Sequence, residues 1–367
     1  MMCSNCLPTS GTRKPSGRRN VKTSDITATV FFIVIAIAGI PDHSVADESG
    51  VGFWQVGTYD SLAATPNQPG WSLTMNTYNG ASFAGNSVAS AQLIRIGAID
   101  PTLRAQVSAH SKGYDDNVTI SPSYLFATPV LGAQAALSVS TTVGHSTSDV
   151  FGTLGGLGAN GFARRLTFNI GDSVTGFGDL NPQVTLYWNS GVHNFLVYGT
   201  GDIPVGEYHK FALANLGIGH GAADVGGGYT YLNYDTGYEF SAVAGFTYNL
   251  KSTSTNYQNG VDFHLDFGAS KYLNDNLFIG PVGYFYEEIG CDSGSGDKVG
   301  CFNSRVAGLG GQIGYSFPIE GLQGYLNLKG YGEFAADNRA PGWNVRLTFS
   351  LSPPLPASTS KGSNMYK

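Results

Sequence analysis

The chain has 367 residues and a formal net charge of −6, with 42% hydrophobic residues, 13% charged residues and 51 glycines. Helical enzymes rarely combine so much glycine with so little charge, and an acidic chain argues against nucleic-acid binding. The 20 tyrosines and 21 phenylalanines favour short strands, either in a membrane barrel or in a soluble β-sandwich.

Residues 1–46 have the pattern of a cleaved signal peptide. A basic cluster at residues 13–22 precedes the apolar run Ala28–Ile40, and Ser44–Ala46 offers small residues for cleavage. The run is shorter than the ~20 residues of a spanning helix, so a membrane anchor is the weaker alternative. Cleavage removes five basic and two acidic residues, which leaves 15 Lys and Arg against 24 Asp and Glu, a formal charge of −9. No later stretch is long enough to span as a helix, so strands would have to cross a membrane.

The two ends of the remaining chain lack strand patterns. Residues 47–69 are too short and proline-rich for a domain, and we expect them to plug the periplasmic mouth of a barrel. Residues 354–367 are expected to form a disordered tail. The barrel would then occupy residues 70–353.

Three strands are expected in the first part of this barrel region, at residues 70–80, 117–127 and 132–144. Residues 88–110 form either an extracellular extension or one more hairpin, which would raise the strand count to fourteen. Residues 145–176 are glycine-rich with little alternation, so we interpret them as a long outer loop that folds inward.

Apolar and polar side chains alternate with a period of two in the rest of the chain, as in strands with two different faces. In Gly342–Ser352, for example, Trp343 and Leu347 share one face and Asn344 and Arg346 the other. Nine strands are expected, at residues 180–190, 193–203, 224–233, 238–250, 261–272, 276–288, 302–317, 322–334 and 342–352.

These segments predict an all-β fold, a transmembrane antiparallel β-barrel of about twelve strands (10 to 14) with long extracellular loops. The connections alternate in length, since tight turns such as Tyr234–Gly237 and Ser190–Val192 alternate with long loops such as Lys251–Gly260. Outer-membrane barrels keep their periplasmic turns short, so the alternation also gives the barrel a direction.

Cys291 and Cys301 flank a loop rich in Gly, Ser and Asp. A structural disulfide is the favoured interpretation outside the cytosol. A metal pair is the alternative, but two cysteines make an incomplete zinc site.

Several strings in the second half of the chain resemble one family of outer-membrane transporters, labelled with the MetA (meta-cleavage) pathway of phenol degradation and including SphA-like proteins. The resemblance is strong over Gly176–Pro353 and weaker over Gly52–Gly144. The strings are GFGDLNPQVTLYWNSGVHNF, GTGDIPVGEY, LANLGIGHGAADVGGGYTY, EFSAVAGFTYN, NGVDFHLDFGAS and GYLNLKGYGEFAADNRAPGWNVRLTFSLSP.

The resemblance implies a monomeric barrel that admits hydrophobic or aromatic small molecules, and it carries no catalytic residues over to this chain. One departure is the tail after Leu351, because many barrels end on an aromatic residue that the assembly machinery reads. In this chain Phe349 would take that role from within the sequence.

The inward face of the predicted strands supplies the candidate lumen-lining residues: Glu239, Asp262, His264, Asp266, Lys329, Tyr325, Tyr331, Glu333 and Arg346. We expect the acidic groups to face Lys329 and Arg346 and to brace a narrow barrel. Asp262, His264 and Ser270 on one strand face also raise a hydrolase hypothesis. A polar barrel interior explains the same pattern more simply.

Other residues have two interpretations each. The glycine-rich stretch around His209 and His220 matches a phosphate loop weakly, and we expect a flexible outer loop with a short helix at Phe211–Leu216. Aromatics toward strand ends, among them Tyr198, Tyr284 and Tyr286, are assigned to interface girdles. Tyr187, Tyr325 and Tyr331 would instead face inward, where they either fill space or stack on aromatic solutes.

The predicted function is passive uptake of small hydrophobic or aromatic compounds across the outer membrane of a Gram-negative bacterium. No cofactor, catalytic residue, metal or nucleic-acid partner is expected, and the partners are outer-membrane lipid, the solute and the assembly machinery. The alternatives are an outer-membrane lipid hydrolase and a structural or adhesive barrel without transport.

Overall fold

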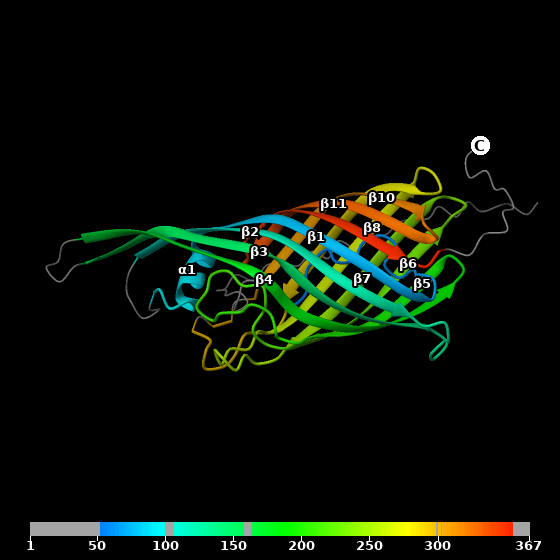
Figure 1. The fold of residues 1–367 in the computed structure, drawn as a ribbon. Helices are drawn as coiled ribbons and strands as arrows, with labels where there is room; N and C mark the ends of the chain where they lie inside the picture. Colours follow the sequence, from blue (N-terminus) through cyan, green and yellow to red (C-terminus); the bar gives the residue numbers. More distant parts are fainter. Residues whose placement is uncertain (1–51, 100–105, 158–162, 299, 302, 355–367) are drawn as a thin grey trace, which may run out of the picture. The chain divides into compact units, whose positions relative to one another are not determined.

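The computed structural model describes residues 52–99, 106–157, 163–298, 300–301 and 303–354. The predicted signal peptide, most of the predicted tail and residues 47–51 lie outside these ranges. The described chain forms a closed antiparallel barrel of twelve strands, in which each strand pairs with its sequence neighbours and β1 pairs with β12 (Figure 1). The strands are β1 Gly70–Ala84, β2 Gln106–Leu125, β3 Gln134–Leu157, β4 Ala163–Ser190, β5 His193–Asp202, β6 Ala222–Asn233, β7 Tyr238–Asn249, β8 Val261–Tyr272, β9 Leu277–Glu288, β10 Arg305–Ile319, β11 Leu322–Asp337 and β12 Gly342–Ser352.

The predicted fold class is confirmed, and twelve strands settle the choice between twelve and fourteen. Alternation along the strands explains why the barrel forms. In β12, Trp343 and Leu347 are exposed on the outer surface, whereas Asn344 and Arg346 are buried inside. Apolar groups can thus face lipid while the backbone hydrogen bonds close around the ring.

The two ends of the barrel differ in their connections. At one end, short turns join β4 to β5, β6 to β7, β8 to β9 and β10 to β11, as predicted. The other end carries the long connections, among them residues 203–221, 250–260 and 289–304. We call them the short-turn end and the long-loop end. Within the described residues, no helix is long and apolar enough to cross a membrane.

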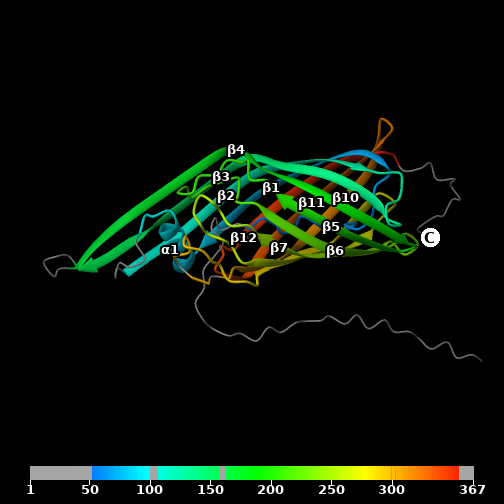
Figure 2. The ribbon, with the colours of Figure 1, turned by 90° about the horizontal axis from the view of Figure 1, so that it is seen from below.

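Strands β2, β3 and β4 continue well beyond the barrel at the long-loop end (Figure 2). We call residues 106–116, 145–157 and 163–175 of these strands the extension. The interpretation of residues 145–176 as a loop was therefore wrong. The reason is that this stretch is rich in Gly, Ser and Thr, which weakens the alternation, while pairing between β3 and β4 holds it in a sheet.

The described part of residues 88–110 forms most of helix α1, Asn86–Arg95, and the start of β2, and contains no additional hairpin. Buried residues of the helix, Ala89 and Leu93, pack with Ala109 and Val150 on the inner face of the extension. Leu213, from the long connection between β5 and β6, joins this cluster. The expected helix at Phe211–Leu216 is absent from the described structure; those residues form turns and bends, and the Leu213 amide is held by the Asp172 carboxylate.

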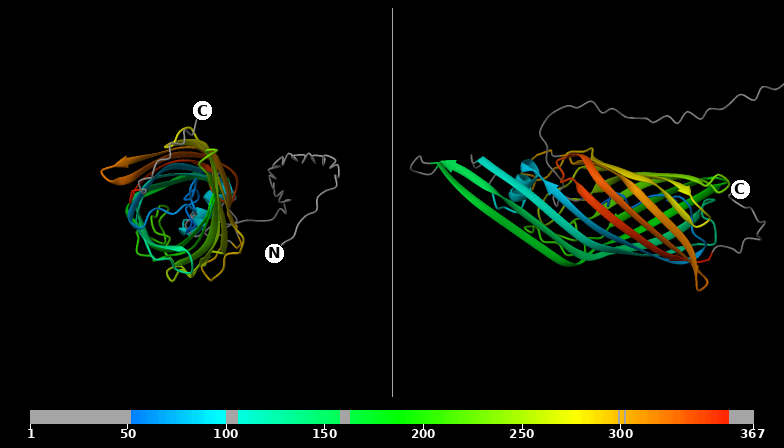
Figure 3. Two further views of the ribbon diagram at one scale, coloured as in Figure 1. Left: turned by 90° about the vertical axis from the view of Figure 1, so that its right-hand side faces the viewer. Right: turned by 90° about the horizontal axis from the view of Figure 1, so that it is seen from above.

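Residues 52–69, here called the inner segment, run inside the ring of strands before β1 begins at Gly70. Figure 3 shows this segment in blue when the barrel is viewed along its axis. Trp54, Val56 and Ala64 are buried in a cluster with lumen residues such as Tyr198 and Tyr284. The inner segment therefore fills the middle of the barrel.

Candidate functional site

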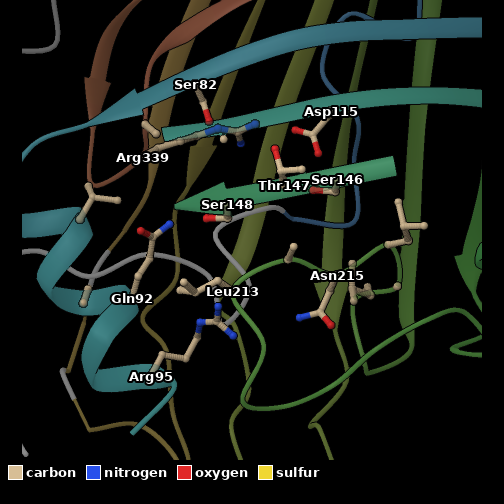
Figure 4. Close-up of a pocket in the computed structure, with 18 of the residues that line it drawn as sticks. Ser82, Gln92, Arg95, Asp115, Ser146, Thr147, Ser148, Leu213, Asn215 and Arg339 are labelled. Carbon is tan, nitrogen blue, oxygen red and sulfur yellow. The ribbon is translucent and has the colours of Figure 1, made fainter. Parts of the chain in front are cut away.

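A cavity of about 460 Å³ opens at the long-loop end and is here called the vestibule. Its walls combine α1, the connection between β5 and β6, and the inner faces of β2 and β3 (Figure 4). Gln92 and Arg95 come from the helix, Leu213 and Asn215 from the connection, and Asp115 from β2. Its volume lies within the ~300–1,000 Å³ range that is usual for small-molecule sites.

The wall beside the barrel is held by carboxylates of β4. Asp179 accepts hydrogen bonds from the Gly206 and Ile218 amides, each at 2.7 Å. The Asp172 carboxylate accepts one from the Leu213 amide at 3.0 Å. Although this connection contains little regular structure, these contacts fix its position against the barrel.

The floor of the vestibule is the start of the inner segment, with Trp54, Gln55 and Val56. Arg346 of β12 donates a hydrogen bond to the Val56 carbonyl at 2.7 Å. Lys329 of β11 donates to the Gly57 carbonyl at 2.9 Å and forms an ion pair with Asp60. The two buried cations thus bind the inner segment.

Buried acidic side chains bind the same segment from the opposite strands. Asp266 accepts hydrogen bonds from the Gly57 and Tyr59 amides, at 2.8 and 3.1 Å. Glu239 accepts one from the Leu62 amide at 3.0 Å. An extended segment has amides and carbonyls that sheet pairing does not satisfy, and these charged groups supply their partners.

The segment also contacts neutral groups. The Ser61 and Ser270 hydroxyls lie 2.6 Å apart, and the Gln183 amide donates to the Tyr59 phenol at 3.2 Å. Burial raises the pKa of Tyr59 above its ordinary value, so the phenol stays neutral and accepts this bond. Polar contacts to the barrel therefore accompany the apolar packing of Trp54, Val56 and Ala64 along the inner segment.

A histidine cluster lies beside Trp54. The Trp54 and His264 rings stack with centroids 3.8 Å apart, and the His264 Nε2 lies 2.9 Å from the Asp224 carboxylate. The Tyr198 hydroxyl is 3.3 Å from the same nitrogen. A side chain at Gly245 would collide with both Tyr198 and His264, so glycine at this position leaves room for their contact.

The cluster contains an Asp–His pair, but the serine that the hydrolase hypothesis requires lies elsewhere. Ser270, the serine of that hypothesis, instead contacts Ser61 and Gln312. Within the described residues, the second ring nitrogen of His264 has no hydrogen-bond partner. No three His, Cys, Asp or Glu side chains lie together as metal ligands in the described ranges.

The structure places the candidate lumen-lining residues inside the barrel. Seven are buried, namely Glu239, Asp262, His264, Asp266, Lys329, Tyr331 and Arg346, and two are partly buried, Tyr325 and Glu333. We expected the acidic lumen residues to face Lys329 and Arg346. Instead, both cations donate hydrogen bonds to the inner segment. Glu333 accepts a hydrogen bond from the Tyr284 hydroxyl at 2.8 Å.

Several inner residues were not predicted. Asp224 was missed although its strand alternates, with Val225 exposed and Asp224 buried, and this pattern could have identified it. The assignment of Tyr198, Tyr284 and Tyr286 to interface girdles was wrong, because all three are buried inside the barrel. Strand-end position alone does not distinguish the two faces.

Two further features lie at the ends of the barrel. Cys291 and Cys301 form a disulfide in the loop between β9 and β10 at the long-loop end. A second cavity, of about 270 Å³, lies at the short-turn end beside Thr65, Asn194 and Tyr234. The inner segment thus lies between a cavity at each end.

Comparison with solved structures shows the fold. An outer membrane channel from Pseudomonas putida F1 is similar with a TM-score of 0.54 and 11% identity, and the alignment covers 81% of this chain and 98% of that one. The translocator domain of the autotransporter NalP from Neisseria meningitidis gives a TM-score of 0.36 at 10% identity, with 78% and 90% covered. The similarity to the Pseudomonas putida structure shows that this chain has the fold of an outer-membrane channel.

No curated protein matches the chain. One family model does, over residues 63–349, and its description is "Putative MetA-pathway of phenol degradation". The matched region begins within the inner segment and ends in β12, so it covers β1 to β11 and most of β12. The chain belongs to this family.

Proposed function

We propose that the protein is an outer-membrane channel through which small aromatic or other hydrophobic compounds enter passively. The observation that carries this proposal is the vestibule, which is open at the long-loop end and ends on the inner segment. The family description, with its reference to phenol degradation, and the similar outer membrane channel support the same function. The working form is a monomer inserted by the outer-membrane assembly machinery.

The vestibule has the composition of a capture site for such compounds. Val88, Ile94, Phe211, Leu213 and Ile218 supply apolar surface, and polar side chains of β2 and β3 face them across the cavity. Apolar pockets with a few polar groups are typical of small-molecule sites. The long-loop end faces the outside of the cell, because outer-membrane barrels have their short turns on the periplasmic side.

The inner segment acts as the plug of this channel. Its contacts with Asp266, Glu239, Lys329 and Arg346 are noncovalent, so each can exchange for water or solute when the segment moves. Passage then requires displacement of the segment toward the short-turn end, or an opening in the barrel wall.

Reconstitution tests the proposal. The full barrel in liposomes is expected to take up phenols and aromatic acids faster than sugars of similar size. Empty liposomes and liposomes with a heat-denatured sample control for diffusion through lipid. Uptake that equals the empty control for every solute in a panel of phenols, alkanes, fatty acids and sugars would refute transport.

A reversible crosslink tests the plug. In Ser61→Cys/Ser270→Cys, the two thiols replace hydroxyls 2.6 Å apart, so oxidation should join the inner segment to β8. We expect the oxidised variant to lose uptake and the reduced variant to recover it. The matched controls are the two single variants, all in a background with Cys291→Ser and Cys301→Ser. Full uptake by the crosslinked barrel would mean that solute passes without movement of the segment.

A further inference from the structure

We propose that the vestibule selects small aromatic carboxylates, with the carboxylate bound by Arg346 at the floor and the ring held against the apolar wall. This inference rests on the proposed function and names the class of solute.

The vestibule carries positive charge in an acidic protein. Its lining includes five basic side chains, Arg95, Lys210, Lys298, Arg339 and Arg346, and two acidic ones, Asp115 and Glu333. The whole chain has the opposite balance, with 20 basic and 26 acidic residues. A concave site with an excess of one charge raises the local concentration of solutes of opposite charge, here anions.

The basic groups are arranged by depth. Lys210 and Lys298 are exposed, so they attract anions from solution. Arg346 lies at the floor and is only 2% exposed. An anion drawn in by the rim would therefore meet a desolvated guanidinium, where an ionic hydrogen bond is stronger than at the surface.

Arg346 has hydrogen-bonding capacity left. One terminal nitrogen donates to the Val56 carbonyl at 2.7 Å, and the guanidinium lies over the Tyr78 ring at 4.7 Å. Within the described part of the chain, its buried Nε has no hydrogen-bond partner. A buried donor without a partner is costly, and a carboxylate can accept two parallel bonds from one guanidinium.

The remaining wall fits an aromatic ring with one acidic group. The aromatic residues Trp54, Tyr78 and Tyr257 line the cavity, and Leu213 and Ile94 add aliphatic surface. Asp115 and Glu333 face the same space and would repel a second carboxylate. The site therefore favours a monocarboxylate over a neutral ring and over a dicarboxylate.

Equilibrium dialysis of the full barrel in lipid nanodiscs tests the proposal with benzoate and benzamide, which share a ring and differ in charge. Wild-type protein is expected to bind benzoate about tenfold more tightly than benzamide, and phthalate more weakly than benzoate. Arg346→Gln should remove the preference, so that benzoate binds no more tightly than benzamide to the variant. Lys298→Gln, at the exposed rim, should weaken benzoate binding less than about twofold.

The fold of each variant is checked by the mobility of the unheated barrel on gels. If Arg346→Gln does not fold, the wild-type protein still decides the question, because added NaCl must weaken binding of benzoate but not of benzamide. Equal binding of the two compounds, or uptake without benzoate binding, would overturn the carboxylate inference and leave the channel intact. A preference for benzoate that survives Arg346→Gln would overturn the role of Arg346. Absence of both binding and uptake would instead refute the proposed function.

Discussion

The barrel wall and the extension are continuous parts of the same strands, yet their inner and outer faces have opposite polarity. In the wall, Val118, Val143 and Phe177 form one row across β2, β3 and β4 on the outer surface. The next outward-facing row toward the long-loop end is Asp116, His145 and Thr175. The outer surface thus changes from apolar to polar between these two rows, although Tyr114 and Phe151 are exposed farther out on the extension.

The inner face changes in the opposite direction. In the wall it carries Ser138, Ser140 and Thr142 of β3, whereas in the extension Val150 is fully buried against α1. Each face takes the polarity of its surroundings, since lipid covers the outside of the wall and water the outside of the extension. We therefore expect the membrane to end near these two rows on this side of the barrel.

The largest effect is expected from the inner face of the extension. Leu93→Ala empties space between α1 and Val150, and should lower the stability of helix docking by about 2–5 kcal/mol. Hydrogen exchange of the α1 amides measures this loss, with Ser87→Ala on the exposed side of the helix as the control. Unchanged protection in Leu93→Ala would show that this inner face is not a packed core.

The second effect compares the two outer faces directly. Leu347, 39% exposed near the middle of β12, would face lipid, and Leu347→Arg should destabilise the barrel by about 2–4 kcal/mol. Ser173→Arg, on the outer face of the extension, should change stability by less than about 0.5 kcal/mol. Denaturant unfolding in lipid vesicles gives both values. Equal costs would break the assignment of the membrane boundary.

The smallest effect concerns the ion pair between Lys112 and Asp149 on the outer face of the extension. Their nitrogen and oxygen are 3.5 Å apart, and the side chains are 41% and 38% exposed. In water such a pair contributes about 0.2–1 kcal/mol, so Lys112→Ala should cost no more than that, and less in high salt. A loss of several kcal/mol, insensitive to salt, would indicate that the extension is not in water.

The comparison also explains what the sequence could predict. Alternation predicted a part of each of the twelve strands and nine residues that lie inside the barrel, because every residue of a barrel wall faces either lipid or lumen. The extension was missed because small and polar residues interrupt the alternation along β3, as at Ser146, Ser148 and Gly152. Polarity alone made it resemble a loop.

The contacts of the inner segment could not be predicted from the sequence, for a different reason. Asp266 and Gly57 are 209 residues apart in the chain, and Arg346 and Val56 are 290 apart. Alternation in β8 and β12 places Asp266 and Arg346 in the lumen but says nothing of what meets them there. Such pairs arise only when the ring has closed.

That closure has a consequence for how the molecule is made. The inner segment leads directly into β1, and β1 pairs with β12, the last strand to be synthesised. The β1–β12 seam can therefore form only after β12 has been synthesised, so the lumen that encloses the inner segment is complete only at the end of synthesis.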